Sequence, residues 1–348
     1  MKIHEMKLPH KIIIGEEILQ SLSEIDNRIT QSKRVFLVTG PNVYDIIRPR
    51  IEDNWRQNQE IQICFIKKPD LDEVKRVENI SKKFKPDLII AIGGGRVIDI
   101  GKIIAYKLDL DFLSIPTTAS HDGMASQFAS IKGMDKPYSI LTKPPSIVIV
   151  DLNMIINSPT RLLYSGVGDV LAKITAVKDW KLAYETRGEY FGEYAAQLVL
   201  MGVELVKKNI QGIRNGETES IRTLIEALIS CGVASGIAGS SRPCSGSEHL
   251  FSHALDLYSK SIALHGEQCG IGTIMMSKLH GLDYENVKEI LKILGMPTKA
   301  KEIGVNEKDL VKSLLKASEI RSERYTILNE VKLNDQTALR LAKDTGVC

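Results

Sequence analysis

The sequence lacks most of the features that would assign it to a special class. Its five cysteines are odd in number, widely spaced and never in a C-x-x-C pair, so we expect reduced, mostly packing cysteines rather than a disulfide framework or a thiolate zinc site. A formal net charge of only +3 gives no reason to expect nucleic acid or an anionic membrane as a partner. No signal peptide and no apolar run of bilayer length are evident, which favours a cytoplasmic protein without membrane insertion.

The sequence pattern indicates two domains with different secondary structure. A chain of 348 residues is too long for one ordinary core. Residues 1–157 alternate short β-branched runs with helical patterns, which predicts an α/β, Rossmann-like domain with a parallel sheet covered on both faces. Residues 158–348 are helical almost throughout. The strands expected in the first domain are Arg34–Thr39, Ile61–Ile66, Asp87–Ile92, Phe112–Ile115 and Ile147–Val150, with helices at Leu71–Phe84 and Val97–Lys107.

A glycine-rich turn marks a candidate nucleotide site in the first domain. The segment Asp87–Lys102 reads DLIIAIGGGRVIDIGK, a buried strand followed by three glycines and a helix. Glycines let the backbone approach a ligand closely, and the first N–H groups of a helix suit a pyrophosphate. The spacing is not that of G-x-G-x-x-G, so a tight connection without a ligand is the alternative. Thr117, Thr118 and Ser120 follow the next strand, where an open α/β sheet places ligand contacts.

Three of the seven histidines form a candidate metal site in the second domain. His249 and His253 are four residues apart, on one helix face, and His265 opens the next helix. Two or three imidazoles and a carboxylate are the ligands that a catalytic divalent metal requires, and Asp169 in GVGD is the candidate carboxylate. The alternatives are a histidine pair without a metal and an Asp169 that caps a helix.

Five motifs occur in a fixed order: GGGRVIDIGK, PTTASHDG, GVGD, GSEHLFSHALD and HGEQCGIG. With them the sequence resembles the glycerol dehydrogenase and dehydroquinate synthase superfamily, and within it the archaeal sn-glycerol-1-phosphate dehydrogenases. The resemblance covers nearly the whole chain. It implies a Rossmann-like N-terminal domain, an all-helical C-terminal domain and an active site in the cleft between them.

The resemblance also implies a role for each motif. It implies NAD or NADP as cofactor, one Zn²⁺ per subunit bound by Asp169, His249 and His265, and a homo-oligomer, either a dimer or an octamer. The substrate, dihydroxyacetone phosphate or sn-glycerol 1-phosphate, would contact Asp122, Asp169 and His253, and Asp122 and His253 would be catalytic. The cofactor would contact Gly93, Gly94, Gly95, Arg96 and Val97 with its pyrophosphate, and Thr117, Thr118, Ala119, Ser120 and Ser126 with its nicotinamide side.

Reduction of dihydroxyacetone phosphate to the glycerophosphate backbone of archaeal ether phospholipids is therefore the expected activity. A Lewis-acid zinc would stabilise the negative charge that hydride transfer develops on the ketone oxygen. Plain glycerol dehydrogenase is the nearest alternative. A lyase of dehydroquinate-synthase type would need more Lys and Arg around its substrate, and a non-catalytic nucleotide-binding protein would not need the metal ligands.

Two finer expectations concern the phosphates. Arg242, with Ser245, Gly246 and Ser247 opening a helix with free N–H groups, would bind the substrate phosphate; a surface Arg242 and a plain N-cap are the alternative. At the adenosine end, Gly40 leaves room and Asn42 can bind either form of the ribose, so we expect both NADH and NADPH to work. Lys67 and Lys68 could reach a 2′-phosphate or serve only as solvated surface.

Overall fold

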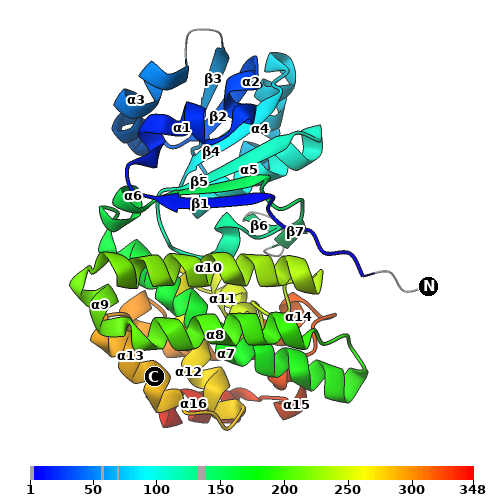
Figure 1. Ribbon diagram of the computed structural model, residues 1–348. Coiled ribbons are helices and arrows are strands. Elements are labelled where there is room, and N and C mark those ends of the chain that lie inside the picture. Colours follow the sequence, from blue (N-terminus) through cyan, green and yellow to red (C-terminus); the bar gives the residue numbers. More distant parts are fainter. Residues whose placement is uncertain (1–3, 56–58, 69, 132–137) are drawn as a thin grey trace. The chain divides into compact units, whose positions relative to one another are not determined.

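The structure, a computed structural model, describes residues 4–55, 59–68, 70–131 and 138–348. It contains two compact units (Figure 1). We call the first the sheet unit, which spans Lys7–Ala119 and Gly123–Pro159. We call the second the helical unit, which contains Thr160–Cys348 together with Ser120–Asp122 and residues 4–6.

The sheet unit is built on a six-stranded, all-parallel sheet with the order β1-β8-β5-β4-β2-β3. Five of these strands occur where the apolar runs predicted them, whereas the edge strand β1 was not expected. A short antiparallel hairpin, β6 (Phe128–Ile131) with β7 (Tyr138–Leu141), was also not expected. The sheet strands are β1 (Lys11–Gly15), β2 (Arg34–Thr39), β3 (Glu60–Phe65), β4 (Leu88–Gly93), β5 (Asp111–Pro116) and β8 (Ile147–Asp151).

Alternate residues of the central strands enter two separate apolar cores. In β2, Phe36 and Val38 join one core with residues of α4 (Leu71–Phe84) and α5 (Gly95–Leu108). Val35 and Leu37 join the other, with residues of α1 (Leu22–Ile25), α2 (Asn27–Gln31) and α3 (Pro41–Trp55). Both faces of the sheet are therefore covered, as fully apolar parallel strands require.

The strand order places a topological switch point between β2 and β4. From β2 the chain continues through α3 on one face to β3, whereas from β4 it continues through α5 on the other face to β5. Ligands of open α/β sheets bind beside the carboxyl ends of the two strands at such a point. Here these ends are Thr39, followed by Gly40, and Gly93.

The helical unit follows a short α6 (Leu152–Ile156) of the sheet unit and contains the long segments that the sequence predicted as helices. Its elements are α7 (Thr160–Arg187), α8 (Glu193–Lys208), α9 (Ile210–Asn215), α10 (Thr218–Ala238), α11 (Ser247–Tyr258), α12 (His265–Leu279), α13 (Tyr284–Ile293), η3 (Ala300–Ile303), α14 (Glu307–Ile320), α15 (Ile327–Val331) and α16 (Asp335–Asp344).

One expectation about α10 is corrected. By length and composition α10 is long and apolar enough to cross a membrane, so an apolar segment of bilayer length does exist. However, 67% of its apolar window is buried inside the protein. Cys231, Ala234 and Ala238 of α10 belong to an apolar cluster with Trp180 of α7. Packing in the helical core therefore accounts for the composition of this helix.

Candidate active site

Asp169 lies in the middle of α7, where α7 and α12 touch through their backbones. A Cβ atom on Gly168 would lie 2.2 Å from the carbonyl oxygen of Gly266, and a Cβ on Gly266 would lie 1.7 Å from the carbonyl oxygen of Ser165. Only glycine permits this approach. The alternative in which Asp169 caps a helix is wrong, because Asp169 lies in the interior of α7, beside the start of α12.

His249 of α11 is oriented towards Asp169 by its sequence neighbour. Its Nδ1 lies 2.7 Å from Oε1 of the fully buried Glu248, so Nδ1–H donates to this carboxylate and Nε2 faces Oδ1 of Asp169 at 3.4 Å. A carboxylate behind the ring is the usual support for a histidine that ligates a metal. Burial lowers the pKa of His249, but Cys269, Asp169 and Glu248 together raise it well above its usual value. The groups around His249 therefore favour a positive charge at its Nε2 atom.

His265 presents the same ring atom to the same carboxylate. The hydroxyl of Ser252 donates to Gln268 at 2.7 Å and lies 3.3 Å from Nδ1 of His265. The hydroxyl oxygen therefore accepts from Nδ1–H, which leaves Nε2 of His265 as the free lone pair. This atom lies 3.9 Å from Oδ1 of Asp169.

These donors fit a divalent metal ion. The ligand atoms of Asp169, His249, His265 and Cys269 all lie within 4.8 Å of one another. A tetrahedral ion with bonds of about 2.0 to 2.3 Å sets its ligand atoms about 3.3 to 3.8 Å apart, close to the 3.4 and 3.9 Å above. Imidazole nitrogens with a carboxylate suit zinc, iron or another transition metal better than Mg²⁺ or Ca²⁺. The three ligands expected from the resemblance thus lie together.

A buried lysine joins this group to Asp122. Lys173, one helical turn after Asp169, is 0% exposed, with Nζ 2.8 Å from Oδ1 of Asp169 and 2.9 Å from Oδ2 of Asp122. The N–H of Asp122 also donates to Asp169 Oδ2 at 3.0 Å. Burial lowers the pKa of Lys173, but Asp122 and Asp169 raise it well above its usual value, so the lysine is charged. Asp122 is thereby held beside the metal ligands.

His253 lies one helical turn after His249. Its ring is stacked with that of His265, the centroids 6.2 Å apart. Burial, and then the nearby His265, lower the pKa of His253 to about 3. The ring is therefore neutral near pH 7, a state in which it can pass a proton on without holding a charge.

The glycine turn of the sheet unit leads into α5 without a side-chain cap. Gly94 is the N-cap of α5 and contributes no side chain, so the first N–H groups of α5 meet no capping group from that residue. Gly93 is needed for the turn itself, because a Cβ there would lie 2.7 Å from Cβ of Val97. The N–H of Thr117 donates to Gly93 O at 3.0 Å, and a Cβ on Gly94 would lie 3.5 Å from Oγ1 of Thr118. The two expected cofactor segments are thus adjacent.

The remaining cofactor candidates occupy varied positions. Gly40 ends β2 at the switch point, with no atom within 4 Å of a Cβ built on it, and exposed Asn42 lies in the first turn of α3. Lys67 and Lys68, after β3, are exposed. Arg96 is exposed and Val97 is buried at the start of α5, whereas Ala119 is fully buried. The carbonyl of Ser120 accepts from Ser165 Oγ at 3.4 Å, and Ser126 Oγ accepts from the Phe128 N–H at 3.0 Å.

The geometry disfavours the expected phosphate role of Arg242. Its guanidinium is 4% exposed and forms a two-bond ion pair with Glu189, and it also donates to the Tyr325 carbonyl at 2.8 Å. The start of α11 is not free either, because the Ser247 N–H donates to Asp179 at 2.6 Å and the Gly246 N–H to Glu248 at 2.7 Å. A local pattern could not reveal Glu189, which lies far away in the sequence.

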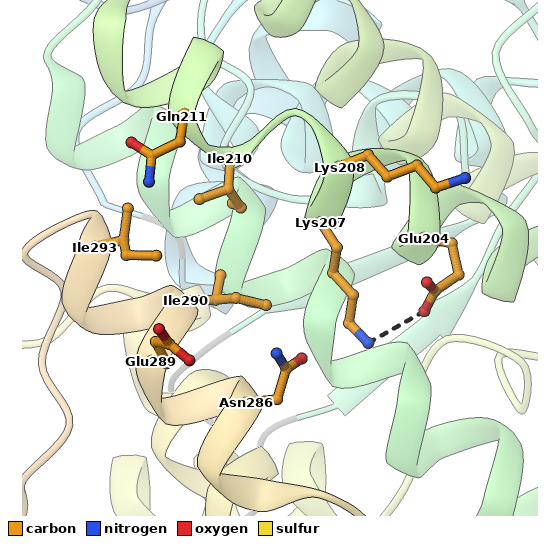
Figure 2. Close-up of a pocket in the computed structure, with 9 residues that line it drawn as sticks. All are labelled: Glu204, Lys207, Lys208, Ile210, Gln211, Asn286, Glu289, Ile290 and Ile293. Atoms are coloured by element: carbon orange, nitrogen blue, oxygen red, sulfur yellow. Dashed lines mark hydrogen bonds and ion pairs between the residues drawn. The ribbon is translucent and has the colours of Figure 1, made fainter.

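A surface hollow in the helical unit is unrelated to these groups (Figure 2). It has a volume of about 430 Å³ and lies where α8 and α9 meet α13. Lys207 and Glu204 form an ion pair across its rim at 3.1 Å. None of the candidate metal ligands or cofactor residues lines it. The lining residues are Glu204, Lys207, Lys208, Ile210, Gln211, Asn286, Glu289, Ile290 and Ile293.

Comparison with known proteins gives concordant results. The family model described as iron-containing alcohol dehydrogenase matches residues 13–159. The chain is 46% identical to the glycerol-1-phosphate dehydrogenase [NAD(P)+] of Pyrococcus furiosus over 99% of this chain and 100% of that one. It is 45% identical to the enzyme of the same name from Nitrosopumilus maritimus over 100% and 98% of the two chains. The chain belongs to the glycerol-1-phosphate dehydrogenase family. The resemblance drawn from the five motifs is thus confirmed, and the chain is an oxidoreductase.

Solved structures support the fold. A probable glycerol dehydrogenase from Sinorhizobium meliloti superposes with a TM-score of 0.81 at 19% identity, over 99% of this chain and 100% of that one. Glycerol dehydrogenase from Schizosaccharomyces pombe gives a TM-score of 0.77 at 20% identity, over 100% and 94% of the chains. The predicted fold class, a parallel-sheet domain followed by a helical domain, is confirmed.

Three residues that the motifs did not predict lie against the candidate metal ligands: Lys173, Glu248 and Cys269. Lys173 and Cys269 each follow a predicted ligand by four residues, which on a helix places them on the same face. Glu248 directly precedes His249. These spacings are the signals that could have found them, but the burial of a lysine or a glutamate is visible only in the structure.

Glu248→Gln should weaken metal binding by about 10- to 100-fold, the usual cost of losing the group behind a histidine ligand. The amide has nearly the same shape but no charge to hold the Nδ1–H of His249. Competition with a chromophoric chelator measures the affinity. Glu189→Gln, which alters the ion pair of Arg242, serves as a control and should leave the affinity unchanged. Equal metal affinity in wild type and Glu248→Gln would exclude this role of Glu248.

Proposed function

We propose that this protein reduces dihydroxyacetone phosphate to sn-glycerol 1-phosphate with NADH or NADPH, and so supplies the glycerophosphate backbone of ether phospholipids. The observation that carries the proposal is the group of Asp169, His249 and His265 in a chain that matches relatives of this name along its whole length. A metal-ligand set of this kind has no use in a non-catalytic nucleotide-binding protein.

The cofactor site proposed here lies along the carboxyl edge of the sheet unit, within residues 1–157. The pyrophosphate lies over Gly93, Gly94 and Gly95 at the start of α5, and the adenosine end lies towards Gly40 and Asn42. The adjacency of the glycine turn to Thr117 and Thr118 supports a nicotinamide on that side. The other contacts proposed from the resemblance are Arg96, Val97, Ala119, Ser120 and Ser126.

In the helical unit, within residues 158–348, we assign one zinc ion per chain to Asp169, His249 and His265. When bound, this Lewis acid stabilises negative charge on the substrate oxygen. Glu248 orients His249, and Lys173 holds Asp122 in place. The neutral His253 relays the proton that the reduced oxygen takes up, and Asp122 and Asp169 contact the substrate. The side chains thus position the reactants, while the nicotinamide supplies the hydride.

The decisive experiment follows the absorbance of the reduced nicotinamide. Dihydroxyacetone phosphate should cause net oxidation of NADH or NADPH, and chiral analysis should identify sn-glycerol 1-phosphate. A lyase of dehydroquinate-synthase type gives no net change in the nicotinamide band. Faster oxidation of glycerol than of glycerol 1-phosphate in the reverse direction would favour a plain glycerol dehydrogenase.

Gly40→Asp should shift the cofactor preference towards NADH by about tenfold or more, because a carboxylate repels a 2′-phosphate and accepts the ribose 2′-OH. The wild type should use both cofactors, with specificity constants within about a hundredfold. Room for the new side chain exists, since no atom lies within 4 Å of a Cβ at Gly40. The ratio of kcat/KM for NADH and NADPH measures the shift. Gly40→Asn, which adds similar bulk without charge, separates repulsion from crowding. An unchanged ratio in Gly40→Asp would place 2′ recognition elsewhere.

One face of α8 carries exposed apolar side chains that bear on the oligomeric state. Tyr194, Met201 and Leu205 of α8 are 72%, 55% and 43% exposed, and their spacing of seven and four residues puts them on one helix face. Such an apolar stripe supports self-association. We therefore propose a homo-oligomer, a dimer or an octamer. We also propose that the protein is cytoplasmic.

A further inference from the structure

We propose that Cys269 is a fourth protein ligand of the metal, so that the enzyme without substrate holds its ion with Asp169, His249, His265 and a thiolate. This inference rests on the metal centre of the proposed function and extends it, because neither the spacing of the motifs nor the resemblance assigned the cysteine a role. On binding, a bond forms between sulfur and the metal, and the thiol proton passes to solvent.

The position of Cys269 follows from the start of α12. Cys269 lies one helical turn after His265, on the same helix face. Its side chain is 0% exposed, and Sγ lies 3.5 Å from Nε2 of His265. Sγ also belongs to the group of four ligand atoms that lie within 4.8 Å of one another.

The separations match four corners of one coordination sphere. Asp169 Oδ1 lies 3.4 Å from Nε2 of His249 and 3.9 Å from Nε2 of His265, and the sulfur lies 3.5 Å from the latter atom. A tetrahedral ion with zinc–ligand bonds sets such atoms about 3.3 to 3.8 Å apart. The sulfur therefore lies where a fourth ligand would lie. It is not merely a packing group beside the other three ligands.

The surroundings of the other buried cysteines differ. Cys64 lies in an apolar core of the sheet unit, and Cys231 and Cys244 lie in an apolar cluster of the helical unit. A buried free cysteine usually behaves as a small apolar residue in such a place. The sulfur of Cys269 faces the imidazoles of His249 and His265 instead.

A thiolate changes which ion the site prefers. Soft sulfur ligands favour Zn²⁺ and Co²⁺ over Mg²⁺ and Mn²⁺. The sequence contains no C-x-x-C pair, but one thiol can join ligands that come from three different helices. The expected consequence is a strong preference for zinc or cobalt over hard divalent ions.

The test uses the full-length protein, first freed of metal and then loaded with one equivalent of Co²⁺ or Zn²⁺. Wild type should bind one ion per chain, the cobalt form should show a near-ultraviolet sulfur-to-cobalt charge-transfer band, and X-ray absorption of the zinc form should show one sulfur at about 2.3 Å. Cys269→Ser should lose the band and the sulfur shell and bind zinc about tenfold more weakly or worse. Cys64→Ser, equally conservative but in the sheet unit, should keep all three properties.

The outcomes separate this inference from the proposed function. A bound ion with only nitrogen and oxygen neighbours in wild type would overturn the role of Cys269 and leave the three-ligand metal centre intact. Failure of the wild type to bind any divalent ion would overturn the metal centre itself. Because the wild-type spectra decide the matter, the test does not depend on the folding of Cys269→Ser.

Discussion

His265→Ala should abolish tight metal binding and lower turnover about a thousandfold, the equivalent of about 4 kcal/mol of transition-state stabilisation. The ring supplies one Nε2 ligand, and the tautomer fixed by Ser252 and Gln268 makes that atom available. Alanine leaves a gap that neither Ser252 nor Gln268 can fill. Elemental analysis of the purified variant and kcat with dihydroxyacetone phosphate are the two measurements.

His253→Ala is the matched control, since it removes a histidine of the same pocket that we place on the substrate. This variant should keep its metal and lose rate or substrate affinity. Activity that survives both exhaustive chelation and His265→Ala would exclude the metal from catalysis. Loss of metal in His253→Ala would instead make His253 a ligand.

Much of the fold could be predicted because the pattern of apolar residues directly reflects burial. The strand Arg34–Thr39 and the helix Leu71–Phe84 have the predicted bounds, since both combine a clear periodicity with clear ends. The strand Lys11–Gly15 was not predicted, because it pairs with β8 at Ile147–Asp151, which is distant in the sequence. An edge strand of five residues depends on that distant pairing more than on its own composition.

The candidate site could likewise be predicted only in part. The spacing of His249 and His253 and the position of His265 predicted a metal site with Asp169 as the candidate carboxylate. The choice of Asp169, His249 and His265 as the three ligands came from the resemblance. Arg242 looked like a free cation, because three helices, α8, α9 and α10, separate it in the sequence from its partner Glu189. Charged groups such as Lys173 are recognised as functional only when burial and partners are known, since the same residue on a helix surface would merely be solvated.

Lys173→Met should destabilise the metal-free protein by about 3 to 5 kcal/mol, the usual cost of breaking a buried ion pair from one side. The substitution keeps the length of the side chain and removes the cation between Asp169 and Asp122. Asp169 is 1% exposed, and in the wild type Lys173 is foremost among the groups that hold its pKa well below the usual value against the effect of burial. Without Lys173, the buried carboxylate of Asp169 and the partly exposed carboxylate of Asp122 both lose their cation.

Denaturant unfolding in the presence of a chelator measures this loss, and Lys181→Met on the same helix provides the control. The Lys181 side chain is 58% exposed and lies 3.9 Å from Glu185, so its removal should cost no more than about 1 kcal/mol. Saturating zinc should recover part of the stability of Lys173→Met, because a divalent cation at Asp169 replaces some of the lost positive charge. If Lys173→Met and Lys181→Met lost equal stability, Lys173 would not be the group that neutralises Asp169 and Asp122.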